Sequence, residues 1–302
     1  MLGGYLPLEG DGPYRAAPPQ LLGLLDQQAD RFGLPARMDY ELIIDVNSEE
    51  YLRSGHMRTF LGGEDALHER DFYLGHHESE PFIKAAAYQL RSAVEYPEHV
   101  DAGRTIGAAL EGMKTFDAYM GAYTRLSEDV FGTMMRPYLG SYPDGTRNAS
   151  GAFMASVQLA ELMLHAPTEG QTKYIDESMR YFPRWSKEIM KGWHEESARG
   201  GNVTDMVLGG ELRLSVDAKT SLIELLNKFL DFRLKHLAVT RKQIPIAFEG
   251  RDVPVSRKQL AEFGEPDILA EGAKGTAGFD IIHVLGGAAY RLIANKQQLE
   301  EM

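Results

Sequence analysis

The sequence predicts an all-α protein, folded as a helical bundle. Apolar residues recur every three or four positions over most of the chain after residue 60, as they do on the buried face of an α-helix. Only residues 39–47, DYELIIDVN, are typical of a short β-strand. Glycine, proline and charged residues separate the periodic segments, where connecting loops are expected.

Helices are expected, in chain order, at residues 21–32, 81–96, 105–121, 126–135, 151–165, 172–193, 216–238 and 279–299. The helix that starts at Pro81 takes Ser79 as its N-cap, because proline is favoured in a first turn. Its predicted buried face consists of Ile83, Ala87, Leu90 and Val94. Residues 194–214 and 240–276 are predicted to be loops.

Composition and charge exclude several classes of protein. The chain has 302 residues, 43% of them hydrophobic, which is enough to bury a substantial core. Its net charge of −12 argues against a nucleic-acid-binding surface, which would concentrate Lys and Arg. The absence of cysteine excludes disulfides and thiolate ligands. No phosphate-loop, dinucleotide-binding or H-E-x-x-H motif occurs, so neither a nucleotide cofactor nor a zinc site is expected.

The N-terminal 20 residues are rich in glycine and proline and predict an irregular arm. No shift in composition marks a second boundary, so we expect residues 1–60 to pack as an arm on one helical domain, residues 61–302. Glu9 and Asp11 interrupt the stretch that a secretory signal would need, and no window has the roughly 18 to 20 apolar residues that cross a bilayer. A cytoplasmic location without membrane contact is therefore expected.

One predicted helix places a histidine on its apolar face. In residues 219–245, KTSLIELLNKFLDFRLKHLAVTRKQIP, His236 continues the apolar series of Leu222, Leu225, Leu226, Phe229 and Phe232. At about 100° per residue His236 falls on the same face, so we expect its ring to point into the core. A buried imidazole needs a partner, either a backbone carbonyl or a metal such as haem iron. The spacing alone leaves both interpretations open.

Five segments in the same order resemble the haem-dependent aromatic oxygenase superfamily, which includes indoleamine and tryptophan 2,3-dioxygenase. They are MMRPYLGSY (residues 134–142), NASGAFMASVQLAELML (148–164), SMRYFPRWSKEIM (178–190), FRLKHLAVTRKQIP (232–245) and AKGTAGFDIIHVL (273–285). The resemblance implies an indoleamine/tryptophan 2,3-dioxygenase-like helical bundle that binds haem b (iron-protoporphyrin IX). It also implies that His236 is the proximal ligand of the haem iron.

The resemblance extends to further site residues. Arg136 would clasp the carboxylate of an amino-acid substrate, Thr276 would contact its amino and carboxylate groups, and Phe131 would line the same pocket. A last group resembles the small residues close to the haem and the substrate: Ser150, Gly151 and Gly275.

The distal side of the haem has two candidate histidines. GHHESEPFIK (residues 75–84) resembles the helix of tryptophan 2,3-dioxygenase that carries an active-site histidine. An ungapped match through Glu80 and Lys84 selects His76. Pro81 changes how the backbone enters the predicted helix, so His77 remains the alternative.

In length and in the runs YLPLEG and HHESEPF, the chain is most similar to the haem-dependent tyrosine hydroxylases of bacterial natural-product pathways. These enzymes convert L-tyrosine to 3,4-dihydroxyphenylalanine (L-DOPA) with hydrogen peroxide, early in the biosynthesis of antibiotics. Two alternatives stay open: a dioxygenase that opens the indole ring of tryptophan with dioxygen, and a haem carrier or sensor without turnover. Relatives are commonly homo-oligomers, but no surface in the sequence identifies an interface.

Overall fold

The computed structural model describes residues 19–32, 42–98, 101–123, 129–135, 154–182, 184–243, 256–263 and 281–302. All regular secondary structure within these ranges is helical, which confirms the all-α prediction. In order, the elements are α1 (Pro19–Phe32), η2 (Leu42–Val46), α2 (Asn47–Ser54), α3 (Gly63–Glu95), α4 (Ala102–Tyr123), η3 (Asp129–Met135), α5 (Ala155–Leu164), α6 (Glu169–Ser178), η6 (Met179–Tyr181), α7 (Arg184–Ser197), α8 (Val203–Leu208), α9 (Val216–Gln243), α10 (Arg257–Phe263) and α11 (Ile281–Glu301).

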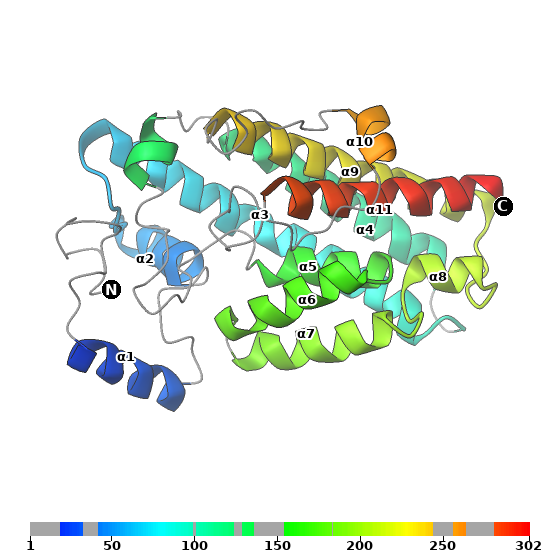
Figure 1. Cartoon of the computed structure of the whole chain (residues 1–302), viewed down its shortest axis with the longest axis horizontal. Helices are drawn as coiled ribbons and strands as arrows, with labels where there is room; N and C mark the ends of the chain where they lie inside the picture. The colour runs from blue at the N-terminus through cyan, green and yellow to red at the C-terminus, as the bar shows by residue number, and fades with distance from the viewer. Residues whose placement is uncertain are drawn as a thin grey trace.

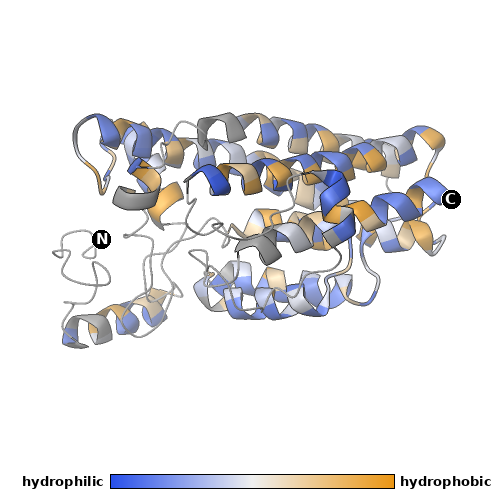
Figure 2. Cartoon of the chain, turned by 45° about the horizontal axis from the view of Figure 1, so that its top comes forward, coloured by the Kyte–Doolittle hydropathy of each residue, from blue (hydrophilic) through white to orange (hydrophobic). Residues whose placement is uncertain are grey.

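The core lies between long helices that pack side by side (Figure 1). Helix α4 packs against both α3 and α9, α9 also packs against α11, and α5 packs against α3. Orange and blue alternate along the long helices in Figure 2, as expected for helices with one buried face. Within the described ranges, no helix has the length and apolar character needed to cross a membrane.

The two apolar faces predicted in detail are both confirmed. On α9, Leu222, Leu225, Leu226 and Phe229 have no accessible surface and Phe232 is 5% exposed. On α3, Ile83, Ala87 and Leu90 are fully buried, and Val94 is 7% exposed. Periodicity alone identified these positions because both helices are covered along a single face.

Helix α3 begins much earlier than predicted, and Pro81 lies inside it. The additional turns are held by Glu69, whose buried carboxylate accepts from the Tyr73 hydroxyl at 2.6 Å and from the backbone N–H groups of Phe60 and Leu61 at 2.9 Å. Ser79 is therefore not an N-cap. Its hydroxyl donates to the carbonyl of His76 within the helix, at 3.0 Å.

The predicted strand at residues 39–47 is wrong for its described part, which is helical from Leu42 onward. Ile43 and Ile44 are adjacent and both buried, whereas a strand would direct them to opposite faces. The side chain of Asn47 then donates to the carbonyl of Arg58 at 2.7 Å and accepts from its N–H at 2.9 Å. This pair of bonds closes the loop between α2 and α3.

Two other boundaries differ from the prediction. The single helix expected at residues 172–193 is divided into α6, η6 and α7, because Phe182 precedes a proline and is extended, with φ −89° and ψ 149°. The loop expected at residues 194–214 contains α8, which Asn202 caps by accepting from the N–H of Asp205 at 2.9 Å. Helix α10 lies within the second expected loop, residues 240–276, where α9 also continues to Gln243.

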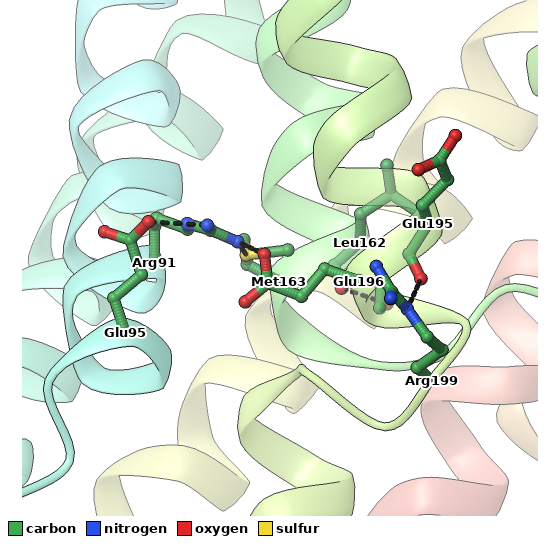
Figure 3. A network of polar contacts seen from close by, with 8 residues as sticks. Arg91, Glu95, Leu162, Met163, Glu195, Glu196 and Arg199 are labelled. Carbon is green, nitrogen blue, oxygen red and sulfur yellow. Dashed lines mark hydrogen bonds and ion pairs between the residues drawn. The ribbon is translucent and has the colours of Figure 1, made fainter.

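A polar network joins α3 to α7 across α5 (Figure 3). Arg91 of α3 pairs with Glu196 of α7 and, at 2.5 Å, with Glu95. Its guanidinium carbon lies 5.4 Å from the ring centroid of Trp193, and Nη1 lies 3.9 Å from the sulfur of Met163. The arginine thus ties three helices together at the end of the bundle where α3 ends.

The division into an arm (residues 1–60) and a helical domain (residues 61–302) stays a prediction. Within the expected arm, Ile43 and Ile44 belong to the main hydrophobic core, and η2 packs against α3. Residues 42–54 therefore pack closely on the bundle.

Candidate functional site

His236 lies in the last third of α9, on the face that faces the core. Its ring is half-buried, and its Nδ1 atom is buried without a hydrogen-bond partner among the described residues. Phe232, one turn earlier, packs beside it with a distance of 5.8 Å between ring centroids. Loss of solvation, together with the charges of Arg233 and His76, lowers the pKa of His236 to about 3, so the imidazole is neutral at pH 7.

A second histidine with a strongly lowered pKa, His76, lies on α3. Loss of solvation lowers the pKa of His76 to about 4, so this imidazole is also neutral at pH 7. A charge on His76 would lower the pKa of His236, so the two histidines lie within electrostatic range of each other. Two neutral histidines that are 160 positions apart in the sequence, one on α3 and one on α9, are thus connected electrostatically.

The two neighbouring histidines of α3 have different partners. The Nδ1 atom of His76 lies 2.8 Å from the carbonyl oxygen of Phe72, and the two rings are 4.3 Å apart. The Nδ1 atom of His77 instead lies 2.9 Å from Oδ1 of Asp45 in η2. His77 is therefore held toward η2, whereas His76 is the histidine whose charge would affect the pKa of His236.

Aromatic side chains surround the two imidazoles. Phe131 in η3 is half-buried and lies 5.8 Å from Phe72, measured between ring centroids. On the side of His236, Phe232 packs edge-on against the buried ring of Phe116 at 5.1 Å. The surroundings are thus apolar and rich in rings, which suits a flat aromatic ligand or cofactor.

An arginine–glutamate pair lies beside His236 and was not predicted. Nε of Arg233 is 2.7 Å from Oε1 of Glu161, and Nη2 is 2.5 Å from Oε2, a two-bond arrangement. The side chains are only 12% and 9% exposed, and the pair connects α9 to α5. Arg233 is the residue after Phe232, which belongs to the apolar face of α9. Nothing in the spacing of residues along α9 identifies Glu161, 72 positions earlier, as the partner of Arg233.

A second acidic group lies near the histidines of α3. Oε1 of Glu80 accepts from the Ser156 hydroxyl of α5 at 2.8 Å, whereas Oε2 is buried and has no partner in the described part of the chain. Burial, together with the charge of Asp45, raises the pKa of Glu80 to about 7. A sequence signal did exist, because Glu80 lies four residues after His76 and therefore on the same face of the helix.

Five predicted site residues lie outside the described residues: Arg136, Ser150, Gly151, Gly275 and Thr276. Their roles stay predictions. Of the predicted site, the described part contains Phe131, His76, His77 and His236, and an electrostatic effect connects His76 with His236. Across the residues that can be described, no three or more His, Asp or Glu side chains form a cluster for a metal ion. Haem iron has a different requirement, because the porphyrin supplies four ligands and the protein needs to supply only one.

Comparison with known proteins does not identify a family. No protein-family model matches the chain, and no curated protein matches it. The resemblance to the haem-dependent aromatic oxygenases therefore depends on the five segments and on the site residues they contain.

Proposed function

We propose that the protein binds haem b through His236 and hydroxylates L-tyrosine to L-DOPA with hydrogen peroxide, as a step in natural-product biosynthesis. The observation that carries the proposal is the pair of neutral imidazoles, one from α9 and one from α3, enclosed by aromatic rings. The sequence resemblance implies one proximal and one distal histidine, and two neutral imidazoles on different helices support the proposal.

The chemistry of His236 fits an axial ligand. Iron binds neutral imidazole, and the low pKa of His236 keeps the ring in that form at any pH in the physiological range. The other ring nitrogen of a metal-bound histidine usually donates to an acceptor, and the buried Nδ1 of His236 still lacks such an acceptor among the described residues. When bound, the haem would supply the redox chemistry that activates peroxide.

His76 has the properties of a distal base. The carbonyl oxygen of Phe72 only accepts hydrogen bonds, so Nδ1 of His76 carries the proton and Nε2 carries the lone pair in the neutral ring. With a pKa of about 4, the ring is neutral at neutral pH. His76 would accept a proton from the peroxide and return it to the departing oxygen.

The remaining residues would orient the substrate. Phe72 and Phe131 offer adjacent ring faces on the side of His76, where a tyrosine ring can pack. Arg136 would hold the substrate carboxylate through two parallel hydrogen bonds, and Thr276 would fix its amino end. With the carboxylate, the amino group and the ring of the substrate all held, the ring would have one defined position for the reaction.

The decisive experiment is an absorption spectrum of the haem-reconstituted protein, followed by addition of L-tyrosine or L-tryptophan with peroxide and product analysis by mass. We expect a histidine-ligated haem and a tyrosine product heavier by one oxygen. Tryptophan gaining two oxygens from dioxygen would make the protein a ring-opening dioxygenase, and bound haem without any spectral response to aromatic amino acids would make it a carrier or sensor.

The ligand assignment has its own test. His236→Ala should lose stable haem binding, while His68→Ala, an exposed histidine of α3, should retain it. A normal haem spectrum in the His236→Ala protein would refute the role of this residue as the proximal ligand.

A further inference from the structure

Residues 42–54, which form η2 and α2, are attached to the bundle mainly through α3. Within the described ranges, both elements pack against α3 as well as against each other. Ile43 and Ile44 bury their side chains in the main core. One polar contact also joins the segment to α3, because Oδ1 of Asp45 lies 2.9 Å from Nδ1 of His77. A change of charge near this contact can therefore alter how firmly residues 42–54 are held.

Glu80 follows His77 by three positions on α3 and has an incomplete set of hydrogen bonds. Its Oε1 atom accepts from the Ser156 hydroxyl of α5 at 2.8 Å. Its Oε2 atom is buried and has no partner among the residues that the structure describes. An ionised carboxylate is costly in this position, because one oxygen would bear charge without a donor. The protonated acid therefore fits the position better than the carboxylate does.

The charged groups around Glu80 come from α3 and from the segment itself. Asp45 of η2 is a second acid, and its charge opposes ionisation of Glu80. His77 and Lys84 of α3 favour the ionised form of both acids, whereas Glu49 of α2 opposes ionisation of Asp45. Burial, the largest cause, and the charge of Asp45 together raise the pKa of Glu80 to about 7.

We propose that residues 42–54 form a pH-dependent strap on α3, which the Asp45–His77 contact helps to hold closed and which opens more often once Glu80 ionises. Ionisation adds a second negative charge near Asp45 and leaves the buried Oε2 of Glu80 charged without a donor. When the strap moves away from α3, the charge of Asp45 moves with it and water can reach Glu80. The open form therefore stabilises the carboxylate. Opening exposes the face of α3 that carries His77 and Glu80, and it does not depend on the proposed function.

The size of the effect follows from proton linkage. Glu80 keeps its proton in the closed form, so closure is favoured at low pH and loses this contribution as the pH rises through about 7. If the pKa returns to its ordinary value of 4.5 in the open form, the equilibrium constant for opening rises up to about tenfold between pH 6 and pH 8. Burial of Ile43 and Ile44 favours the closed form at every pH, so the open form stays a minor population.

Hydrogen–deuterium exchange of the backbone amides in residues 42–54, followed by mass spectrometry, measures this opening. The unsubstituted protein and Glu80→Gln are compared at the same pH, so that the chemical exchange rates cancel. We expect the ratio of their exchange rates to be up to about tenfold higher at pH 8 than at pH 6. Asp45→Asn removes the charge that opposes ionisation of Glu80, so it should show a smaller increase. Glu78→Gln, an exposed control on α3, should show the full increase.

Two results would overturn the strap. The first is a ratio of exchange rates that is the same at pH 6 and at pH 8, because Glu80 then has no control over residues 42–54. The second is exchange in residues 42–54 that is as slow as in the buried part of α9 at both pH values. In that case the segment leaves α3 only when the whole protein unfolds.

Discussion

Replacing Glu80 with glutamine should make the protein more stable at alkaline pH. Glutamine has nearly the same shape, its amide oxygen can still accept from Ser156, and it cannot ionise. The carboxyl has an ordinary pKa of 4.5 and a pKa of about 7 in the folded protein. The folded state therefore holds a proton that the unfolded chain releases between these two values.

The sign and size of the effect follow from proton linkage. A raised pKa contributes stability that is fully present below about pH 4.5 and is lost as the pH rises through about 7. Since one pH unit corresponds to about 1.4 kcal/mol, the total loss is about 3 kcal/mol. Glu80→Gln does not incur this loss, so its free energy of unfolding should exceed that of the unsubstituted protein by about 3 kcal/mol at pH 8 and be nearly equal to it at pH 4.5.

The assay is urea unfolding followed by circular dichroism at several pH values between 4.5 and 8, with Glu78→Gln as the control. Other titrating groups are common to all three proteins and cancel in the difference. Glu78 is exposed, so its replacement should give a difference that does not change with pH. A difference between Glu80→Gln and the unsubstituted protein that stays constant from pH 4.5 to 8 would show that Glu80 is ionised throughout and refute the reasoning.

Three further outcomes follow from the same packing. Glu161→Gln should lower the free energy of unfolding by about 3 to 5 kcal/mol because it strands the charge of Arg233, while the double variant with Arg233→Met should recover most of that loss in the same urea assay. Phe229→Ala should cost about 3 to 5 kcal/mol, since the ring is fully buried, and a smaller loss of stability would mean that the core closes over the cavity. His76→Ala should keep the haem absorption spectrum and lose tyrosine hydroxylation, with His68→Ala unaffected; full activity in His76→Ala would exclude it as the distal base.

Local periodicity predicted much of the fold. The apolar face of α9 and the later part of α3 could be read from residues three and four positions apart, because each helix is covered along one face. The same spacing placed His236 on the core side of its helix. Spacing between neighbours in sequence is enough for such positions, since the helix itself brings those side chains together.

Propensity alone failed where distant contacts decide local structure. Pro81 predicted a helix start, but the Glu69 carboxylate and the Tyr73 hydroxyl hold the earlier turns of α3 in place. Ile43 and Ile44 predicted a strand, but both become buried when η2 packs on α3. Burial of these side chains against another helix outweighs the intrinsic preference of a residue for helix or strand, which is worth about a fraction of a kcal/mol per residue.

The sequence by itself determined the helical class, the face of α9 that carries His236, and the two candidate histidines of α3. Only the tertiary structure separated His76 from His77, because the partner of His77 is Asp45 of η2, whereas Nδ1 of His76 contacts the Phe72 carbonyl within α3. It alone also paired Arg233 with Glu161 and enclosed Glu80 beside Asp45 and Ser156. Desolvation and charge depend on atoms that the chain brings together from remote positions, and the spacing of residues along one helix contains no information about them.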